Sequence, residues 1–215
     1  MTNDPRREEF PVKDELIYLN HAAVCPIPRR TAAAVSAMVE EYRDRGSWDY
    51  PHILETVRRG RERLADLIGA QAHEVAYVKN TTSGLMLAAE SIPFREGDSV
   101  VVADIEFPAN VYPWLNLRRK GVEVRMVEAG PDRLLSAEDY REACDETTRA
   151  IAASWVQFST GQRMDVAALA DVAREVGAYL VVDAIQGLGA LQADVELMGA
   201  DILCADGHKW LLSVE

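Results

Sequence analysis

An acidic and a basic side chain follow two short apolar runs near the end of this 215-residue chain. The first run, 179–182, precedes Asp183, and the second, 202–205, precedes Asp206 and, three residues later, Lys209. Apolar runs of this length are typical of strands buried on both faces, and ligands of open α/β sheets bind outside the carboxyl ends of such strands. A carboxylate there is costly to desolvate without a cationic partner. Asp183 and Lys209 therefore either pair with each other or each contact a bound ligand.

The elements that must position these residues alternate between helix and strand along the chain. Hydrophobic periodicity predicts helices over 31–43, 53–68, from 85 to about 92, about 110–120, 137–144 and 166–176. Apolar and β-branched runs predict strands over 75–78, 99–103, 122–127, 150–156, 179–182 and 201–205. This alternation predicts an α/β fold, a mainly parallel sheet with helices on both faces. Gly187 and Gly189 do not form the glycine fingerprint of a dinucleotide-binding fold.

Five short motifs occur in an order that resembles one enzyme family. They are 18–23 (YLNHAA), 80–84 (NTTSG), 106–110 (EFPAN), 181–186 (VVDAIQ) and 207–209 (GHK). Together they resemble the class V aminotransferase family of pyridoxal-phosphate enzymes, which includes cysteine desulfurases, kynureninase and isopenicillin N epimerase-like proteins. The resemblance implies a fold type I large domain, like that of aspartate aminotransferase. It places an N-terminal segment at 1–30 and the cofactor-binding large domain at 31–215.

The resemblance assigns the reactive end of the cofactor, pyridoxal 5'-phosphate (PLP), to two residues. Lys209 would form the Schiff base and then act as the proton shuttle at the substrate Cα. Its pKa would have to be lowered for the neutral amine to be available near neutral pH. Asp183 would pair with the ring nitrogen, because a buried carboxylate favours the protonated ring, which is the better electron sink.

The same resemblance assigns the remaining contacts of the cofactor. Thr81 and Thr82 lie between an expected strand and an expected helix, where backbone N–H groups favour a phosphate. His208 would also contact the phosphate, Gln186 would donate to the phenolic oxygen of the ring, and Phe107 would stack on the ring face.

Each of these residues also has a simpler interpretation when it is taken alone. Thr81 would belong to an ordinary helix N-terminus, and Asp183 would cap a turn after its strand. His208 and Phe107 would be structural or core residues, and Lys209 would be a solvated strand end. Only the order and separation of the whole set favour the functional interpretation.

Three positions depart from the pattern of the cysteine desulfurases. Those enzymes have a histidine where Phe107 stands, so desulfurase chemistry is less expected here. They have a phosphate-binding serine where Asp206 stands, and an ionised aspartate would repel the phosphate. We therefore expect Asp206 to face a backbone amide or Trp210. Phe158 replaces an asparagine of the long loop, which leaves Gln157 beside it as a candidate for substrate contact. Asn20 and His21 are the other candidates.

Composition narrows the class of protein. With 48% hydrophobic residues the chain can bury the core of one large domain, and a net charge of −12 disfavours nucleic acid as a partner. No run is long enough to span a membrane, and residues 1–9 contain no apolar signal core. Three cysteines without CxxC spacing predict a reduced, cytoplasmic protein without a metal site, and Cys25 is expected to be a buried, inert thiol.

Two hypotheses of function follow. In the first, the chain is the large domain of a PLP enzyme acting on an amino acid or amine by transaminase, lyase or epimerase chemistry. The complete protein is then expected to be a homodimer, because members of the family usually dimerise through this domain. They continue for well over a hundred residues into a small domain, which is expected to be absent here. In the second, the chain is a truncated, non-catalytic scaffold with the same fold.

Overall fold

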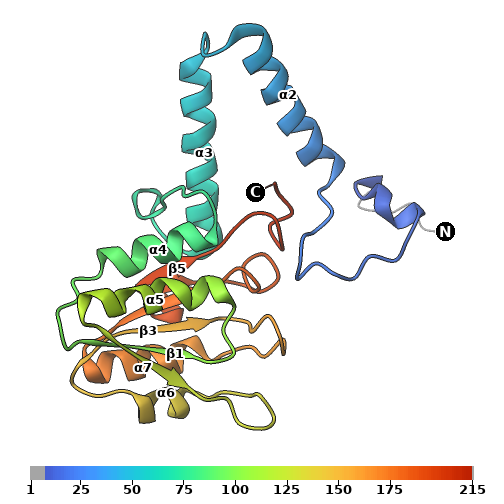
Figure 1. The fold of residues 1–215 in the computed structure, drawn as a ribbon. Helices are drawn as coiled ribbons and strands as arrows, with labels where there is room; N and C mark the ends of the chain where they lie inside the picture. The colour runs from blue at the N-terminus through green and yellow to red at the C-terminus, as the bar shows by residue number, and fades with distance from the viewer. Residues whose placement is uncertain (1–7, 215) are drawn as a thin grey trace.

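A five-stranded parallel sheet forms the centre of the computed structural model, which describes residues 8–214 (Figure 1). Its strand order is β2-β1-β3-β4-β5. The strands are β1 (Ser99–Ala103), β2 (Glu123–Val127), β3 (Thr148–Ser154), β4 (Tyr179–Asp183) and β5 (Ile202–Cys204). The prediction about a signal sequence concerns residues 1–9, most of which lie outside the described part of the chain.

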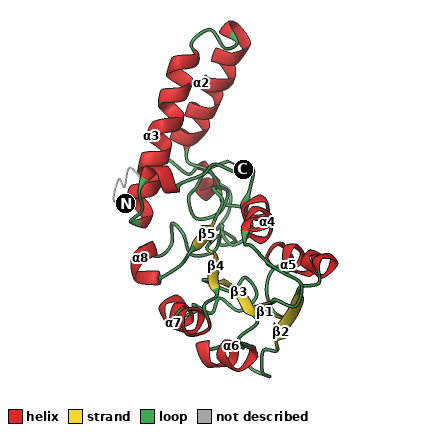
Figure 2. Cartoon of the chain, turned by 90° about the vertical axis from the view of Figure 1, so that its left-hand side faces the viewer, coloured by secondary structure: helices red, strands yellow, loops and turns green. Residues whose placement is uncertain are grey.

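Helices cover both faces of the sheet (Figure 2). The helices α4 (Thr81–Ser91) and α5 (Tyr112–Asn116) lie on one face, and α6 (Ala137–Ala143), α7 (Val166–Val176) and α8 (Val195–Met198) lie on the other. Successive strand residues point to opposite faces, so Val100 and Val102 join the core under α4, whereas Val101 joins the core under α7. The predicted fold class is confirmed.

A hairpin of two long helices projects from the sheet domain (Figure 1). It consists of α2 (Arg29–Arg45), which has no buried residue, and α3 (Tyr50–Ile68), in which Ala65 is buried. A short 3-10 helix, η1 (Pro11–Asp14), lies in the N-terminal segment. The predicted division of the chain at residue 30 stays a prediction. Within residues 8–214, no helix is long and apolar enough to cross a bilayer.

Two predicted elements are wrong. No strand forms over 75–78; this stretch follows the 3-10 helix η2 (Ala72–Glu74) as an extended segment that pairs with no strand of the sheet. Instead, the Tyr77 hydroxyl donates to the Val57 carbonyl of α3 (3.3 Å). The predicted helix 110–120 is divided into η3 (Pro108–Asn110), α5 and η4 (Leu117–Lys120). Pro108 in the first turn of η3 and Pro113 in the first turn of α5 have no backbone N–H to donate, so a single helix does not continue through them.

Candidate active site

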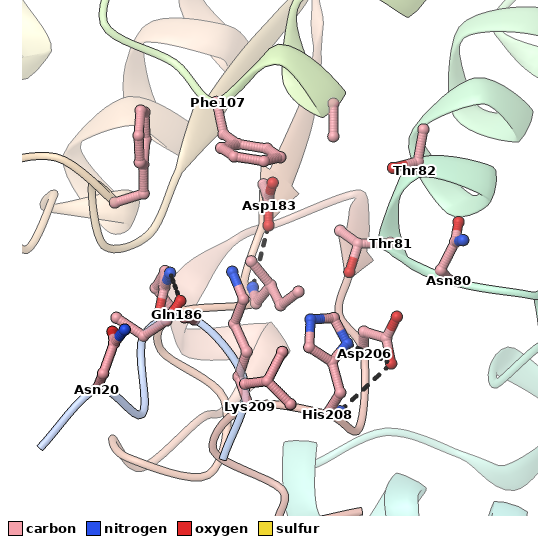
Figure 3. Close-up of a pocket in the computed structure, with 16 residues that line it drawn as sticks. Asn20, Asn80, Thr81, Thr82, Phe107, Asp183, Gln186, Asp206, His208 and Lys209 are labelled. Atoms are coloured by element: carbon pink, nitrogen blue, oxygen red, sulfur yellow. Dashed lines mark hydrogen bonds and ion pairs between the residues drawn. The ribbon is translucent and has the colours of Figure 1, made fainter. Parts of the chain in front are cut away.

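The loops that follow β1, β3, β4 and β5 lie at one edge of the sheet, around a cavity of about 530 Å³ (Figure 3). In the sheet, β2 lies on one side of β1 and β3 lies on the other, so the direction of the strand order reverses between β1 and β3. Ligands of open α/β sheets bind beside such a reversal. The cavity is lined by Asn20, Ala22, Ala23, Val24, Asn80, Thr81, Thr82, Phe107, Ala109, Phe158, Asp183, Ile185, Gln186, Asp206, His208 and Lys209.

Lys209 and Asp183 both line this cavity and are both buried, at 9% and 2% exposure. Burial raises the pKa of Asp183 to about 6, although the Ile185 N–H (3.0 Å) and the charge of Lys209 lower it. Burial also lowers the pKa of Lys209, against the opposing effect of Asp183 and Asp206. The Lys209 ammonium points toward Asp183 and Phe107 (Figure 3), but the lysine and Asp183 form no direct ion pair in the described chain. Both groups therefore remain available to a ligand.

Two aromatic rings form one wall of the cavity. Phe107 follows β1 and Phe158 follows β3, and their ring centres lie 5.2 Å apart in an edge-to-face arrangement. The Lys209 Nζ lies 5.7 Å from the centre of the Phe107 ring. Phe107 is 45% exposed, which is unusual for a core residue and leaves a ring face open to a planar ligand.

The N-terminus of α4 lies at another part of the cavity, where the sequence predicts a phosphate. Asn80 caps this helix, with its Oδ1 accepting from the Ser83 N–H (3.0 Å). Thr81 and Thr82 are the first helical residues, whose N–H groups have no partner within the helix. The Thr81 Oγ1 is buried without a hydrogen-bond partner among the described residues. Gly84 allows this turn to approach β5, since an added Cβ would lie 3.1 Å from the Cys204 sulfur.

His208 and Asp206 lie beside this helix N-terminus (Figure 3). The Asp206 Oδ1 accepts from the His208 backbone N–H (3.4 Å), as expected from the sequence. The same oxygen lies 3.2 Å from the His208 Nδ1, but the two atoms are not aligned for a hydrogen bond. The alternative partner considered for Asp206 is wrong, because the Trp210 indole N–H donates to the Gln186 Oε1 (3.1 Å).

The N-terminal segment contacts two loops at the edge of the sheet: the one that follows β4 and the one that carries Lys209, residues 205–209, which is called the lysine loop below. The Gln186 Nε2 donates to the Ala22 carbonyl (2.9 Å), and the Cys25 N–H donates to the His208 carbonyl (2.9 Å). Asn20 reaches the cavity from this segment. Cys25 is buried, and burial raises the pKa of its thiol, which favours the neutral, unreactive form.

Two predicted candidates do not line the cavity. His21 stacks on the Trp210 ring instead, with centres 5.4 Å apart and an interplanar angle of 17°. Gln157 is 1% exposed, and its Nε2 donates to the Glu106 Oε1 (2.6 Å). Neither side chain therefore lines the cavity.

Glu106 is a buried residue of the site that the sequence reasoning missed. Its Oε1 accepts from the Ser154 N–H (2.8 Å) and from Gln157, and its Oε2 accepts from the Ser154 hydroxyl and from the Asn110 Nδ2 (3.1 Å). Burial, together with the charge of Asp183, raises its pKa to about 7, although the Ser154 and Asn110 donors lower it. The available signal was a glutamate three residues after a buried strand that is apolar except for Ser99, where an acid needs several donors to be buried.

The residues present fit PLP, the cofactor implied by the resemblance. A buried lysine and a buried acid share one cavity, an aromatic ring forms part of its wall, and a buried hydroxyl of Thr81 lacks a partner at a helix N-terminus. One feature opposes a phosphate, the carboxylate of Asp206.

Comparisons with known proteins agree with this arrangement. The family model described as Aminotransferase class-V matches residues 17–213. A probable cysteine desulfurase of Methanothermobacter thermautotrophicus is 35% identical over 98% of this chain, which covers 54% of that protein. A cysteine desulfurase of Haloferax volcanii is 31% identical over 90% of this chain, which covers 48% of it. The chain thus spans about half the length of the curated relatives it matches.

Solved structures give the same result. The apo structure of a cysteine desulfurase from Thermococcus onnurineus NA1 has a TM-score of 0.87 and 26% identity, with 98% of this chain and 54% of that chain covered. A C-DES mutant with glycine covalently linked to its PLP cofactor has a TM-score of 0.89 over 96% of this chain and 56% of its own; at 22% identity it shows the fold alone. From the family match over 17–213, we conclude that this chain belongs to the class V aminotransferases.

Proposed function

We propose that this chain is the cofactor-binding part of a PLP-dependent enzyme that acts on an amino acid or amine. The observation that carries the proposal is the pair of buried groups, Lys209 and Asp183, directed at one cavity without neutralising each other. Membership of the class V aminotransferase family supports the choice of cofactor. When bound, PLP supplies an electron sink for charge that develops at the substrate Cα.

Lys209 would hold the cofactor covalently and, once released by the substrate amine, would carry the proton at Cα. Its lowered pKa increases the fraction of neutral amine near neutral pH, as both tasks require. Asp183 would face the ring nitrogen. With a pKa of about 6, it is mostly ionised at neutral pH and can keep that nitrogen protonated.

The other residues would orient the ring. Thr81, Thr82 and His208 would contact the phosphate, and Phe107 would lie against a ring face. Gln186 uses one of its two amide protons for the Ala22 carbonyl, which leaves the second for the ring oxygen. Asn20 is the proposed substrate contact, because it lines the cavity. His21 and Gln157 would act indirectly, through Trp210 and Glu106.

The specific reaction is proposed to be one that moves a proton at Cα by way of Lys209, which includes transamination, lyase and epimerase chemistry. The matched relatives include proteins named cysteine desulfurases, whose substrate would be cysteine. The Phe107 ring beside the Lys209 Nζ has no titratable group, so it cannot exchange a proton with the substrate. We further propose a homodimer for the complete protein. The free cysteines Cys25, Cys144 and Cys204 support a reducing, cytoplasmic location.

Reductive trapping tests the proposal. The chain is incubated with PLP, reduced with borohydride and mapped by mass spectrometry, and the adduct is expected on Lys209. Lys209→Ala should keep the fold, measured by circular dichroism, and lose the adduct. Lys79→Ala, which changes a lysine outside the cavity, should keep both. An adduct on another lysine, or none in a folded sample saturated with PLP, would overturn the proposal and favour the non-catalytic scaffold.

A further inference from the structure

Asp206 places an unpaired carboxylate oxygen where the phosphate is proposed to bind. Its side chain is 6% exposed, and its Oδ2 is buried with no hydrogen-bond partner in residues 8–214. Asn80 and Thr81 lie on the same side of the cavity as Asp206 (Figure 3), and the Thr81 hydroxyl there also lacks a partner. Two buried, unpaired polar atoms at one place indicate that a ligand completes the site.

The charges around Asp206 do not match a doubly ionised phosphate. The acids lining the cavity are Asp183 and Asp206, and the bases are His208 and Lys209. In the proposed function, Lys209 is committed to the ring rather than to the phosphate. Lys79 lies near Asp206 in a neighbouring groove but does not line the cavity. A phosphate monoester carries about −1.5 to −2 at neutral pH, so an ionised Asp206 would repel it.

The geometry of His208 offers a way to remove this repulsion. Its Nδ1 is 3.2 Å from the Asp206 Oδ1 and has no hydrogen-bond partner in the described chain. An ionised Asp206 carboxylate can only accept hydrogen bonds. One proton added to the Asp206–His208 pair would supply a hydrogen-bond donor. For two groups in such close contact, the proton belongs to the pair rather than to either residue alone.

We propose that Asp206 and His208 form a proton-coupled phosphate site, in which the pair takes up one proton from solvent as the phosphate of PLP enters. The inference rests on the proposed function and adds to it a distinct role for Asp206. It predicts that PLP binds less tightly as the pH rises, because the bound state holds one more proton than the free protein. The phosphate-free aldehyde pyridoxal should lack this component.

The test compares PLP with pyridoxal, by absorbance titration of the 215-residue chain between pH 6.5 and 8.5. The ratio of the two dissociation constants removes the pH dependence that Lys209 contributes, because both ligands react with this lysine through an aldehyde. Asp206→Asn is close to isosteric and removes the charge. It should improve the affinity for PLP relative to that for pyridoxal about tenfold at pH 8.5 and flatten the pH dependence of the ratio, whereas its effect on the Lys209 amine acts on both ligands.

Two further variants sharpen the comparison. Asp206→Ser, which supplies a hydroxyl donor, should match or exceed Asp206→Asn. Asp165→Asn is the control for the loss of one negative charge, because Asp165 caps α7 on the opposite face of the sheet and asparagine is an equally good cap. Circular dichroism confirms that each variant is folded.

The outcomes separate this inference from the proposed function. If Asp206→Asn leaves the ratio and its pH dependence unchanged, or weakens PLP and pyridoxal equally, Asp206 only holds His208 in place and the inference is overturned alone. If the unmodified chain binds neither aldehyde, the proposed function is overturned, and this inference with it.

Discussion

Glu106→Gln should change how the stability of this protein depends on pH. The groups around the Glu106 carboxyl are arranged as donors. The Trp114 indole N–H donates to the Asn110 Oδ1 (3.1 Å), which turns the Asn110 Nδ2 toward Glu106. The Ser154 backbone N–H can only donate. These contacts favour the ionised carboxylate, whereas burial at 5% exposure opposes it, and burial has the larger effect on the pKa.

The magnitude follows from the pKa. Glu106 is raised from an ordinary value of 4.5 to about 7, so between these values the folded chain binds more protons than the unfolded chain. The contribution of Glu106 to stability is therefore fully present below pH 4.5 and is lost as the pH rises through 7. At about 1.36 kcal/mol per pH unit, the loss between pH 5 and pH 7.5 is about 2 kcal/mol.

Urea unfolding at several pH values between 5 and 7.5, followed by tryptophan fluorescence, measures this effect. The free energy of unfolding of the unmodified chain minus that of Glu106→Gln should increase by about 2 kcal/mol as the pH falls across this range. Glu142→Gln, at an exposed position of α6, controls for the loss of one negative charge. A constant difference, or one that decreases on acidification, would refute the reasoning and show that the hydrogen bonds balance or outweigh burial.

Three further changes test the site and its support. Asp183→Ala should weaken PLP binding by about 3 to 5 kcal/mol in absorbance titrations, because it would leave the ring nitrogen unpaired; unchanged affinity would make Asp183 a structural cap. Phe107→Ala should cost about 0.5 to 1.5 kcal/mol of PLP binding beyond the lost area, with Phe107→Tyr as the mild control, and equal effects of the two would exclude stacking. Gly187→Ala should lower the free energy of unfolding by about 1 to 3 kcal/mol, since its Cβ would overlap the Trp155 ring; an unchanged urea midpoint would contradict this overpacking.

The order of strands and helices could be predicted largely because both faces of the sheet are covered. The strands β1 and β4 are nearly continuous apolar runs, and such runs are visible without any knowledge of their neighbours. The stretch 75–78 has a similar composition and is not a strand. Strand formation requires a partner edge, which is a property of the whole fold and not of four residues.

The parts of the site that follow a strand directly could be predicted from the sequence. The parts that depend on hydrogen bonds between residues distant in sequence could not. Asp183 and Lys209 each lie at or after a strand end, so their convergence follows from the parallel sheet. The role of Glu106 depends on donors from Ser154 and Gln157, which are 48 and 51 positions away. The charge conflict at Asp206 was visible in the sequence, but its unpaired oxygen required coordinates.

The contact between the N-terminal segment and the lysine loop has a consequence for the order in which the chain folds during synthesis. Gln186 and Ala22 are 164 positions apart, and the partner of Cys25 is a carbonyl of the lysine loop. The ribosome releases residues 20–25 long before that loop exists. Contacts of such long range form late because a large loop must first be closed. The sheet can therefore assemble before the cavity does, and a ligand of this cavity would bind only chains whose synthesis has passed β5.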